Sequence, residues 1–173
     1  MKLRNIYKPV RMEFMDVGLR KIPKTIHEDF QVDLDPDYQR GHVWNESQKR
    51  KYMGFILQGG EGLPIVINLP NGWGGESEVI DGKQRITAIC EWLTNAVSAE
   101  LADGSEVWYR DFTDEVDLRL LNNTLRIRFG FVQLDRAGVL DYYLRLNNGG
   151  TVHSDEEIEK VRKLLREQKE ENE

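Results

Sequence analysis

The sequence predicts a compact α+β domain in which short strands and helices are intermixed. Short β-branched runs bounded by Gly, Pro or Asn are typical of strands, and apolar residues three and four positions apart are typical of amphipathic helices. Both patterns recur along the chain without an internal repeat. With 173 residues, of which 39% are apolar, the chain is long enough to bury a core of its own.

The first part of the chain contains one clear helix signal. Residues 1–33 mix Lys, Arg and scattered apolar residues without a period, so we expect an arm or an irregular lead-in there. A turn at residues 35–37 (DPD) leads into the aromatic segment YQRGHVW. A helix is expected in NESQKRKYMGFILQGG, because Asn45 and Gln48 have capping-box spacing and Gly59 is a stop signal.

The second part alternates between strands and helices. LPIVINL and EVI flank the glycine-rich NGWGGES, which predicts a hairpin, and a helix is expected from Gln84 onward. A second hairpin is expected about Asp103 and Gly104, followed by a short helix in DEVDLRLL. LRIRFGFVQ alternates as a half-buried strand does, and AGVLDYYLRL is helical. NNGGTVH predicts a loop, after which Ser154 and Glu157 form a capping box for a last, highly charged helix.

Bulk composition excludes several classes of protein. A net charge of −6 argues against nucleic-acid binding by the whole surface, so any such contact has to use a local basic patch. Cys90 is the only cysteine, which excludes an internal disulfide and a cysteine zinc cluster. No run approaches the roughly 18 apolar residues of a membrane span, and MKLRNIYKPV lacks the apolar core of a secretory signal. We therefore expect a cytoplasmic protein without a membrane partner.

The stretch VIDGKQRITAI (residues 79–89) passes from an apolar strand to a helix through an Asp-Gly turn. The first amides of a helix lack intrahelical partners, and together with the helix dipole they form an anion site. Gly82 would let the backbone approach a ligand, Lys83 would supply a point charge, and Arg85 a planar fork for two phosphate oxygens. An interpretation in which Asp81 is only an N-cap and the cations are solvated fits the pattern equally well.

Other side chains extend this candidate site. Gln84 could position a water or a base edge, and Asp81 could hold Mg²⁺ or orient a water. In YQRGHVW, Arg40 could clamp phosphate or stack on a base, although a packed aromatic turn with a surface arginine explains the segment more simply. Arg145 and Asn147 precede an NNGG loop whose backbone could wrap a ligand, while an ordinary helix C-cap accounts for the same residues.

Three boxes, YQRGHVW, VIDGKQRITAI and YLRLNNGG…EEIEK, occur in this order from about residue 34 to residue 160. They resemble the N-terminal domain of GmrSD-type, modification-dependent restriction enzymes, a family of the ParB/sulfiredoxin-like superfamily. The resemblance implies a ParB-like, DGQQR-type domain over residues 34–160, with residues 161–173 as the end of a charged C-terminal helix. It also implies nucleotide binding and hydrolysis at the DGQQR box, in defence against foreign DNA. The matching positions are Asp81, Gly82, Gln84 and Arg85, with Arg40 and Arg145 as neighbours.

Two departures from the family pattern bear on activity. Lys83 stands where the box has its first glutamine, which would strengthen phosphate binding or upset the positioning of water and abolish hydrolysis. Larger family members carry a separate, His-rich nuclease domain, whereas this chain ends soon after the last box. We therefore expect DNA cleavage to require a separate nuclease or effector protein.

The leading hypothesis is a nucleotide-binding protein, leaning towards a Mg²⁺-dependent NTPase that acts in DNA metabolism or phage defence. Its cofactor would be a nucleoside triphosphate with Mg²⁺. Asp81 and Gln84 would be catalytic, with Asp81 also the metal ligand. The phosphates would be held by Gly82, Lys83, Arg85, Arg40, Arg145 and Asn147. The alternative is a non-enzymatic DNA-binding or adaptor module that uses the same cations on a DNA phosphate, and a ParB-like nuclease is a third hypothesis. The sequence leaves open the base, the oligomeric state, and whether the last helix packs on this domain or on a partner.

Overall fold

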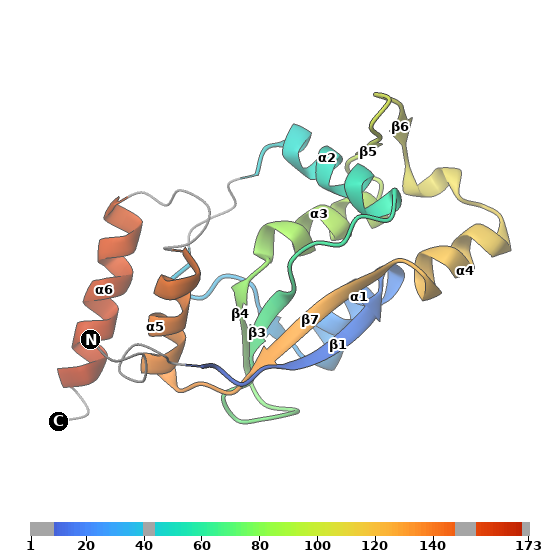
Figure 1. Ribbon diagram of the computed structural model, residues 1–173. Helices are drawn as coiled ribbons and strands as arrows, with labels where there is room; N and C mark the ends of the chain where they lie inside the picture. Colours follow the sequence, from blue (N-terminus) through green and yellow to red (C-terminus); the bar gives the residue numbers. More distant parts are fainter. Residues whose placement is uncertain (1–8, 40–43, 148–154, 171–173) are drawn as a thin grey trace.

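The computed structural model describes residues 9–39, 44–147 and 155–170 and has an α+β fold, as the sequence predicts (Figure 1). The strands are β1 (Glu13–Gly18), β2 (Val32–Asp33), β3 (Ile65–Asn68), β4 (Ser77–Asp81), β5 (Ala99–Glu100), β6 (Glu106–Val107) and β7 (Arg126–Val132). The helices are α1 (Ile22–Lys24), α2 (Glu46–Leu57), α3 (Lys83–Leu93), α4 (Glu115–Asn123), α5 (Arg136–Asn147) and α6 (Asp155–Glu170). Short helical turns are η2 (Leu19–Lys21), η3 (Thr25–Asp29) and η4 (Tyr109–Asp111).

Five of the strands form one mixed sheet in the order β1-β7-β3-β4-β2. β1 is antiparallel to β7 and β3 is antiparallel to β4, whereas β7 and β3 are parallel, as are β4 and β2. The antiparallel pair β3–β4 confirms the hairpin predicted across the glycine-rich loop. β5 and β6 form the second predicted hairpin, whose turn holds Gly104 at a φ of +82°.

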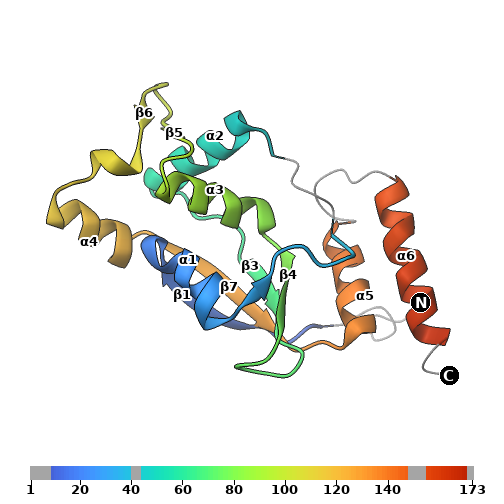
Figure 2. The same cartoon turned by 180° about the vertical axis from the view of Figure 1, so that it is seen from behind.

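Apolar side chains of the sheet pack on both of its faces. In β3, Ile65 and Ile67 join the larger core, whereas Val66 joins a second core on the other side. The larger core is closed by α1, α2 and α3, and the second core by α5 and α6. The two cartoon views agree on this division, with α5 and α6 side by side and apart from α2 and α3 (Figure 2). β3 is therefore buried along its whole length.

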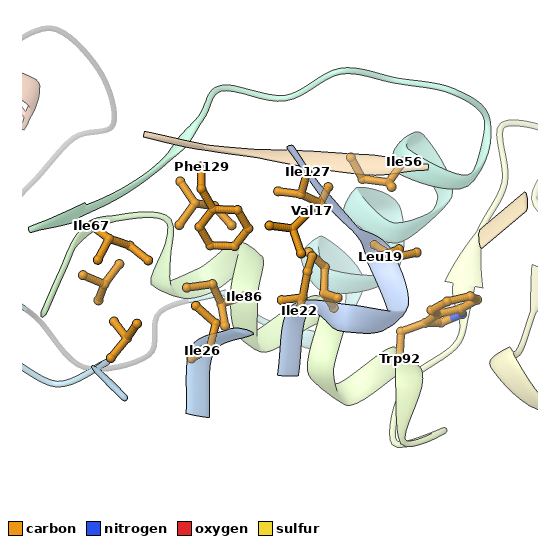
Figure 3. Close-up of a cluster of buried hydrophobic side chains, with 14 of the residues drawn as sticks. Val17, Leu19, Ile22, Ile26, Ile56, Ile67, Ile86, Trp92, Ile127 and Phe129 are labelled. Atoms are coloured by element: carbon orange, nitrogen blue, oxygen red, sulfur yellow. The ribbon is translucent and has the colours of Figure 1, made fainter. Parts of the chain in front are cut away.

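The N-terminal segment differs from the prediction. Residues 13–33, expected to be part of an arm or an irregular lead-in, form β1, η2, α1, η3 and β2. Leu19, Ile22 and Ile26 are completely buried, and Figure 3 shows them within the core together with Ile86 and Trp92 of α3. The prediction failed because each helical piece is too short to display a period. The segment is held by its contacts with the rest of the fold.

Helix α6 packs on α5. Val161 is only 1% exposed, and Leu164 and Leu165 lie against the same second core. The apolar positions of this helix therefore pack on the domain itself.

The capping box predicted at Ser154 falls outside the described residues. No described helix has the length and apolar character needed to cross a membrane.

Candidate functional site

The candidate phosphate-binding turn, at Asp81 and Gly82, connects the end of β4 to the start of α3. β4 ends at Asp81, and Gly82 is the N-cap of α3 with φ of 108° and ψ of 4°. The carbonyl of Gly82 accepts a hydrogen bond from the amide of Ile86 at 2.9 Å, which closes the first helical turn. Within the described residues no side chain caps this helix, so Asp81 does not serve as its N-cap. The amides of the first turn thus point out of a helix end that no described side chain caps.

A glycine is required at position 82 for two reasons. Its φ lies in the left-handed region that L-residues with a side chain rarely adopt. A Cβ atom placed there would also lie 2.8 Å from Cγ1 and 3.1 Å from Cβ of Ile65, a fully buried residue of β3. Gly82 therefore lets the backbone of the turn pass close to β3. The sequence indicated only that Gly82 would let the backbone approach a ligand, and it did not reveal this packing role.

Both cations of the turn are held in ion pairs. Lys83 Nζ donates to Asp35 Oδ1, and Arg85 Nη2 donates to Asp81 Oδ2 at 2.6 Å. Arg85 Nη1 also donates to the carbonyls of Leu63 and Pro64. The Lys83 and Arg85 side chains are only 11% and 12% exposed, whereas those of Asp35 and Asp81 are 78% and 47% exposed. The interpretation with solvated cations is therefore wrong: each cation is oriented by a more accessible carboxylate.

The first sequence box supports the strand that leads to the turn. Gln39 Nε2 donates to the carbonyls of Val79 and Ile80 at 2.5 and 3.0 Å, and the Tyr38 hydroxyl donates to Val79 O at 3.2 Å. These bonds satisfy backbone acceptors of β4 beyond the short stretch that pairs with β2. The sequence analysis did not identify Tyr38 and Gln39 as residues that support the site. The only indication of their role is that they belong to the same sequence box as Arg40. Arg40 itself lies outside the described residues.

A pocket of about 410 Å³ opens beside the turn. Gln84 lies in it with Oε1 accepting a hydrogen bond from the backbone amide of Trp44 at 3.1 Å, which fixes the orientation of the side chain. The polar residues that line the pocket are Gln39, Asp81, Lys83, Gln84, Arg85 and Asn147, and the aromatic and large apolar residues are Trp44, Tyr52, Phe55, Leu63, Ile80 and Tyr143. The pocket thus combines charged groups with an aromatic surface, within the size range of small-molecule sites.

The third box is only partly brought to this pocket. Asn147, at the C-terminus of α5, lines it and donates from Nδ2 to the carbonyl of Tyr143 at 2.7 Å. Arg145 does not line it. Arg145 forms an ion pair with Asp141, with Nε 3.1 Å from Oδ2, and its guanidinium lies 5.4 Å from the ring centroid of Tyr142. The NNGG loop expected to wrap a ligand lies mostly outside the described residues.

The pKa values of two tyrosines, Tyr52 and Tyr142, are affected by burial and by charged residues near the pocket. Burial raises the pKa of Tyr52 to about 12, against the opposing effect of the nearby Arg85. Burial also raises the pKa of Tyr142, with Arg145 lowering it and the Asp81 carboxylate adding to the increase. Both phenols are therefore neutral at physiological pH. Tyr52 contributes a ring and a hydroxyl to the pocket without a charge of its own.

Mg²⁺ at Asp81 would need ligands from outside the protein. Among the described residues, no three His, Cys, Asp or Glu side chains gather as a metal-binding set. Mg²⁺ commonly takes one or two carboxylates together with phosphate oxygens and water, so a single exposed carboxylate beside an anion site suits a phosphate-bound metal. The residues fit this kind of site and do not form a cage for a metal alone.

No curated protein sequence matches the chain. A solved structure of the C-terminally truncated chromosome-partitioning protein ParB from Caulobacter crescentus, complexed with CTP-gamma-S, matches with a TM-score of 0.44 and 16% sequence identity. The match covers 91% of this chain and 65% of the ParB chain, less than two thirds of it.

A family model described as the GmrSD restriction endonuclease, N-terminal domain, matches residues 23–171. This confirms the resemblance carried by the three boxes, and the chain belongs to the GmrSD restriction endonuclease N-terminal domain family.

Proposed function

We propose that the turn between β4 and α3 binds the phosphates of a nucleoside triphosphate and hydrolyses it with Mg²⁺, as part of DNA restriction. The observation that carries the proposal is the convergence, in one pocket of about 410 Å³, of Lys83 and Arg85 with an α3 N-terminus that no side chain in the described part of the chain caps. The family's description as part of a restriction endonuclease supports the link to DNA.

The ion pairs explain how the site would exchange partners. Lys83 and Arg85 are held nearly out of solvent, so their orientation is set before a ligand arrives. Asp35 and Asp81 are far more exposed and can turn towards water when phosphate oxygens take their places. Phosphate carries more charge than one carboxylate and would also meet the amides of the first turn of α3. Among the described residues, neither carboxylate forms a hydrogen bond with those amides.

Displacement of Asp81 from Arg85 would prepare it for chemistry. Its carboxylate would then serve as the protein ligand of Mg²⁺ or as the group that orients the attacking water. The metal ion, when bound, would neutralise charge on the phosphate oxygens. Gln84, held by the amide of Trp44, would position the water, and electrostatic stabilisation would account for most of the rate increase.

The test is phosphate release from ATP, GTP, CTP and UTP with Mg²⁺, with binding measured in parallel by calorimetry. We expect Arg85→Ala to lose binding and turnover together, and Asp81→Asn to lose turnover with a modest loss of binding. Arg126→Ala is the matched control, because Arg126 is an exposed arginine of β7 outside this pocket and should change neither quantity. A wild-type protein that binds none of the four nucleotides would refute the proposal.

A DNA phosphate is the second candidate ligand for the same cations, favoured by the restriction family to which the chain belongs. In that case the protein would bind DNA without releasing phosphate from nucleotides. Its affinity would fall steeply with salt, since each neutralised phosphate releases counterions. Titration of duplex DNA at several salt concentrations, with wild type and Arg85→Ala, distinguishes this function from nucleotide binding.

A further inference from the structure

We propose that the aromatic part of the same pocket is a base-binding surface, with the ring of Phe55 as its main contact. We call the side chains of Trp44, Tyr52 and Phe55 the aromatic wall. The inference rests on the proposed function, because it assigns the base end of the nucleotide whose phosphates the turn between β4 and α3 would hold. The ligand class is a nucleotide, as opposed to a simple polyphosphate.

Large apolar side chains are exposed at this pocket. Phe55 is 47% exposed and Leu63 is 77% exposed, and both line the pocket that contains the cations. Single exposed apolar residues are common on proteins, but exposed apolar residues gathered in a charged pocket point to a ligand with both characters. A nucleotide has such a composition, with an anionic tail and a flat, weakly polar base.

Helix α2 carries two residues of the aromatic wall beside its core face, and Tyr52 also packs against the edge of the larger core. Tyr52 and Phe55 are three residues apart and therefore share one face of the helix. The neighbouring Met53 and Ile56 are 0% and 3% exposed and belong to the larger core. Trp44, just before the helix, packs on Tyr52 with ring centroids 5.3 Å apart and an interplanar angle of 60°. One helix thus supplies a core face and an aromatic face that borders the pocket.

The ring of Phe55 is held in place although it is not buried. A Cβ atom on Gly60 would lie 2.4 to 2.5 Å from three atoms of this ring, so the ring rests against the bare backbone of Gly60. The amide of Gly60 donates to the carbonyl of Phe55 at 2.8 Å, which ties the turn to the end of the helix. A ring that already packs on the backbone before binding loses less conformational freedom when a ligand stacks on it.

The chemistry of stacking sets the expected specificity. Every base has a π-face, so an aromatic ring binds all four bases and discriminates weakly among them. The aromatic wall would therefore select nucleotides over inorganic polyphosphates without strongly selecting one base. Loss of one base–aromatic stack corresponds to about 5- to 150-fold weaker binding.

The experiment compares two probes, a nucleoside triphosphate and inorganic tripolyphosphate, by calorimetry on the full chain. Phe55→Ala should bind the nucleotide about 5- to 150-fold more weakly and tripolyphosphate as tightly as wild type does. Phe14→Ala is the matched control, because Phe14 is 59% exposed on β1 and does not line this pocket. That variant should bind both probes with wild-type affinity.

A second variant moves the ring without removing it. Gly60 does not have a positive φ, so Gly60→Ala is compatible with the backbone, but the new methyl group must displace the Phe55 ring. The ring is the end of a flexible side chain, so the melting temperature should change little. Nucleotide affinity should fall selectively, as it does in Phe55→Ala.

Three outcomes overturn the inference in distinguishable ways. If wild type binds the nucleotide and both variants bind it equally well, the base lies elsewhere and the proposed function stands. If Phe55→Ala weakens both probes equally, Phe55 supports the phosphate site and does not contact a base. If wild type binds neither probe, the proposed function fails and the base-binding surface fails with it.

Discussion

Replacement of Gly82 by alanine should destabilise the protein strongly at a single, well-defined point. The alanine would have to adopt a backbone φ of 108°, which costs a residue with a side chain roughly 1–2 kcal/mol. Its Cβ would also lie 2.8 Å from Cγ1, 3.0 Å from Cγ2 and 3.1 Å from Cβ of Ile65. A rotamer change of Ile65 cannot relieve the contact with its Cβ, because the backbone of β3 fixes that atom. Overpacking of this kind costs about 1–3 kcal/mol.

The sum is a loss of about 2–5 kcal/mol in the free energy of unfolding, a large part of the roughly 5–15 kcal/mol of a typical domain. Gly104→Ala is the matched control. Gly104 has a φ of +82° in the β5–β6 turn, and a Cβ there would meet no atom within 4 Å. This control should lose only the backbone contribution, about 1–2 kcal/mol. The difference between the two variants isolates the contact with Ile65.

Urea unfolding followed by tryptophan fluorescence measures both free energies, since the chain has four tryptophans. We expect Gly82→Ala to be less stable than Gly104→Ala by about 1–3 kcal/mol. Equal destabilisation of the two variants would refute the reasoning, because it would mean that the turn between β4 and α3 does not depend on its close approach to β3.

Three further predictions concern side chains that lie on or against β4 and α3. Asp35→Asn should free Lys83 from its ion pair and tighten tripolyphosphate binding by up to about fivefold at low salt, measured by calorimetry. Gln39→Leu should leave the carbonyl of Ile80 without its side-chain donor and that of Val79 with only the Tyr38 hydroxyl. The free energy of unfolding, measured in urea, should fall by about 1–3 kcal/mol. Burial raises the pKa of the Cys90 thiol to about 11, so a thiol reagent at pH 8 should label it slowly in the folded protein and quickly in urea. Because the unfolded thiol ionises at lower pH, stability should also fall as the pH rises from the ordinary thiol pKa towards 11.

Each of these predictions has a result that contradicts it. Unchanged or weaker phosphate binding by Asp35→Asn would mean that the carboxylate does not compete with the ligand for Lys83. Wild-type stability of Gln39→Leu would show that the carbonyls of Val79 and Ile80 find other donors. Rapid labelling of Cys90 at pH 8 in the folded protein would show that its helix face opens readily to solvent.

Much of the secondary structure follows from local sequence patterns. The strands β3 and β7 and the helix α2 lie within the segments where periodicity and turn residues predict them. β4, α3, α4 and α5 overlap their predicted segments and extend one or two residues beyond them. Hairpins such as β3–β4 are also local, because the pairing partner is the next strand along the chain. β1 and the short helical pieces before β2 were not predicted. Their structure depends on pairing with β7, more than a hundred residues away, and on burial in the larger core.

The sequence by itself determined the position of the candidate site and its chemical character. Asp81, Gly82, Lys83, Gln84 and Arg85 are consecutive, so a strand-to-helix turn is enough to bring them together. Their residue types already indicate an anion site, because glycine flexibility, helix-end amides and cationic side chains are properties of the local chain.

Only the tertiary structure decided the neighbours of that turn. Asp35 pairs with Lys83, Gln39 supports β4, and Phe55 joins the pocket, whereas Arg145 is turned to its own helix. These contacts join segments that are far apart in the sequence, and they depend on how α2 and α5 pack on opposite faces of one sheet. No local pattern carries that information, because the same residues would form the same turns and helices in a fold that kept them apart.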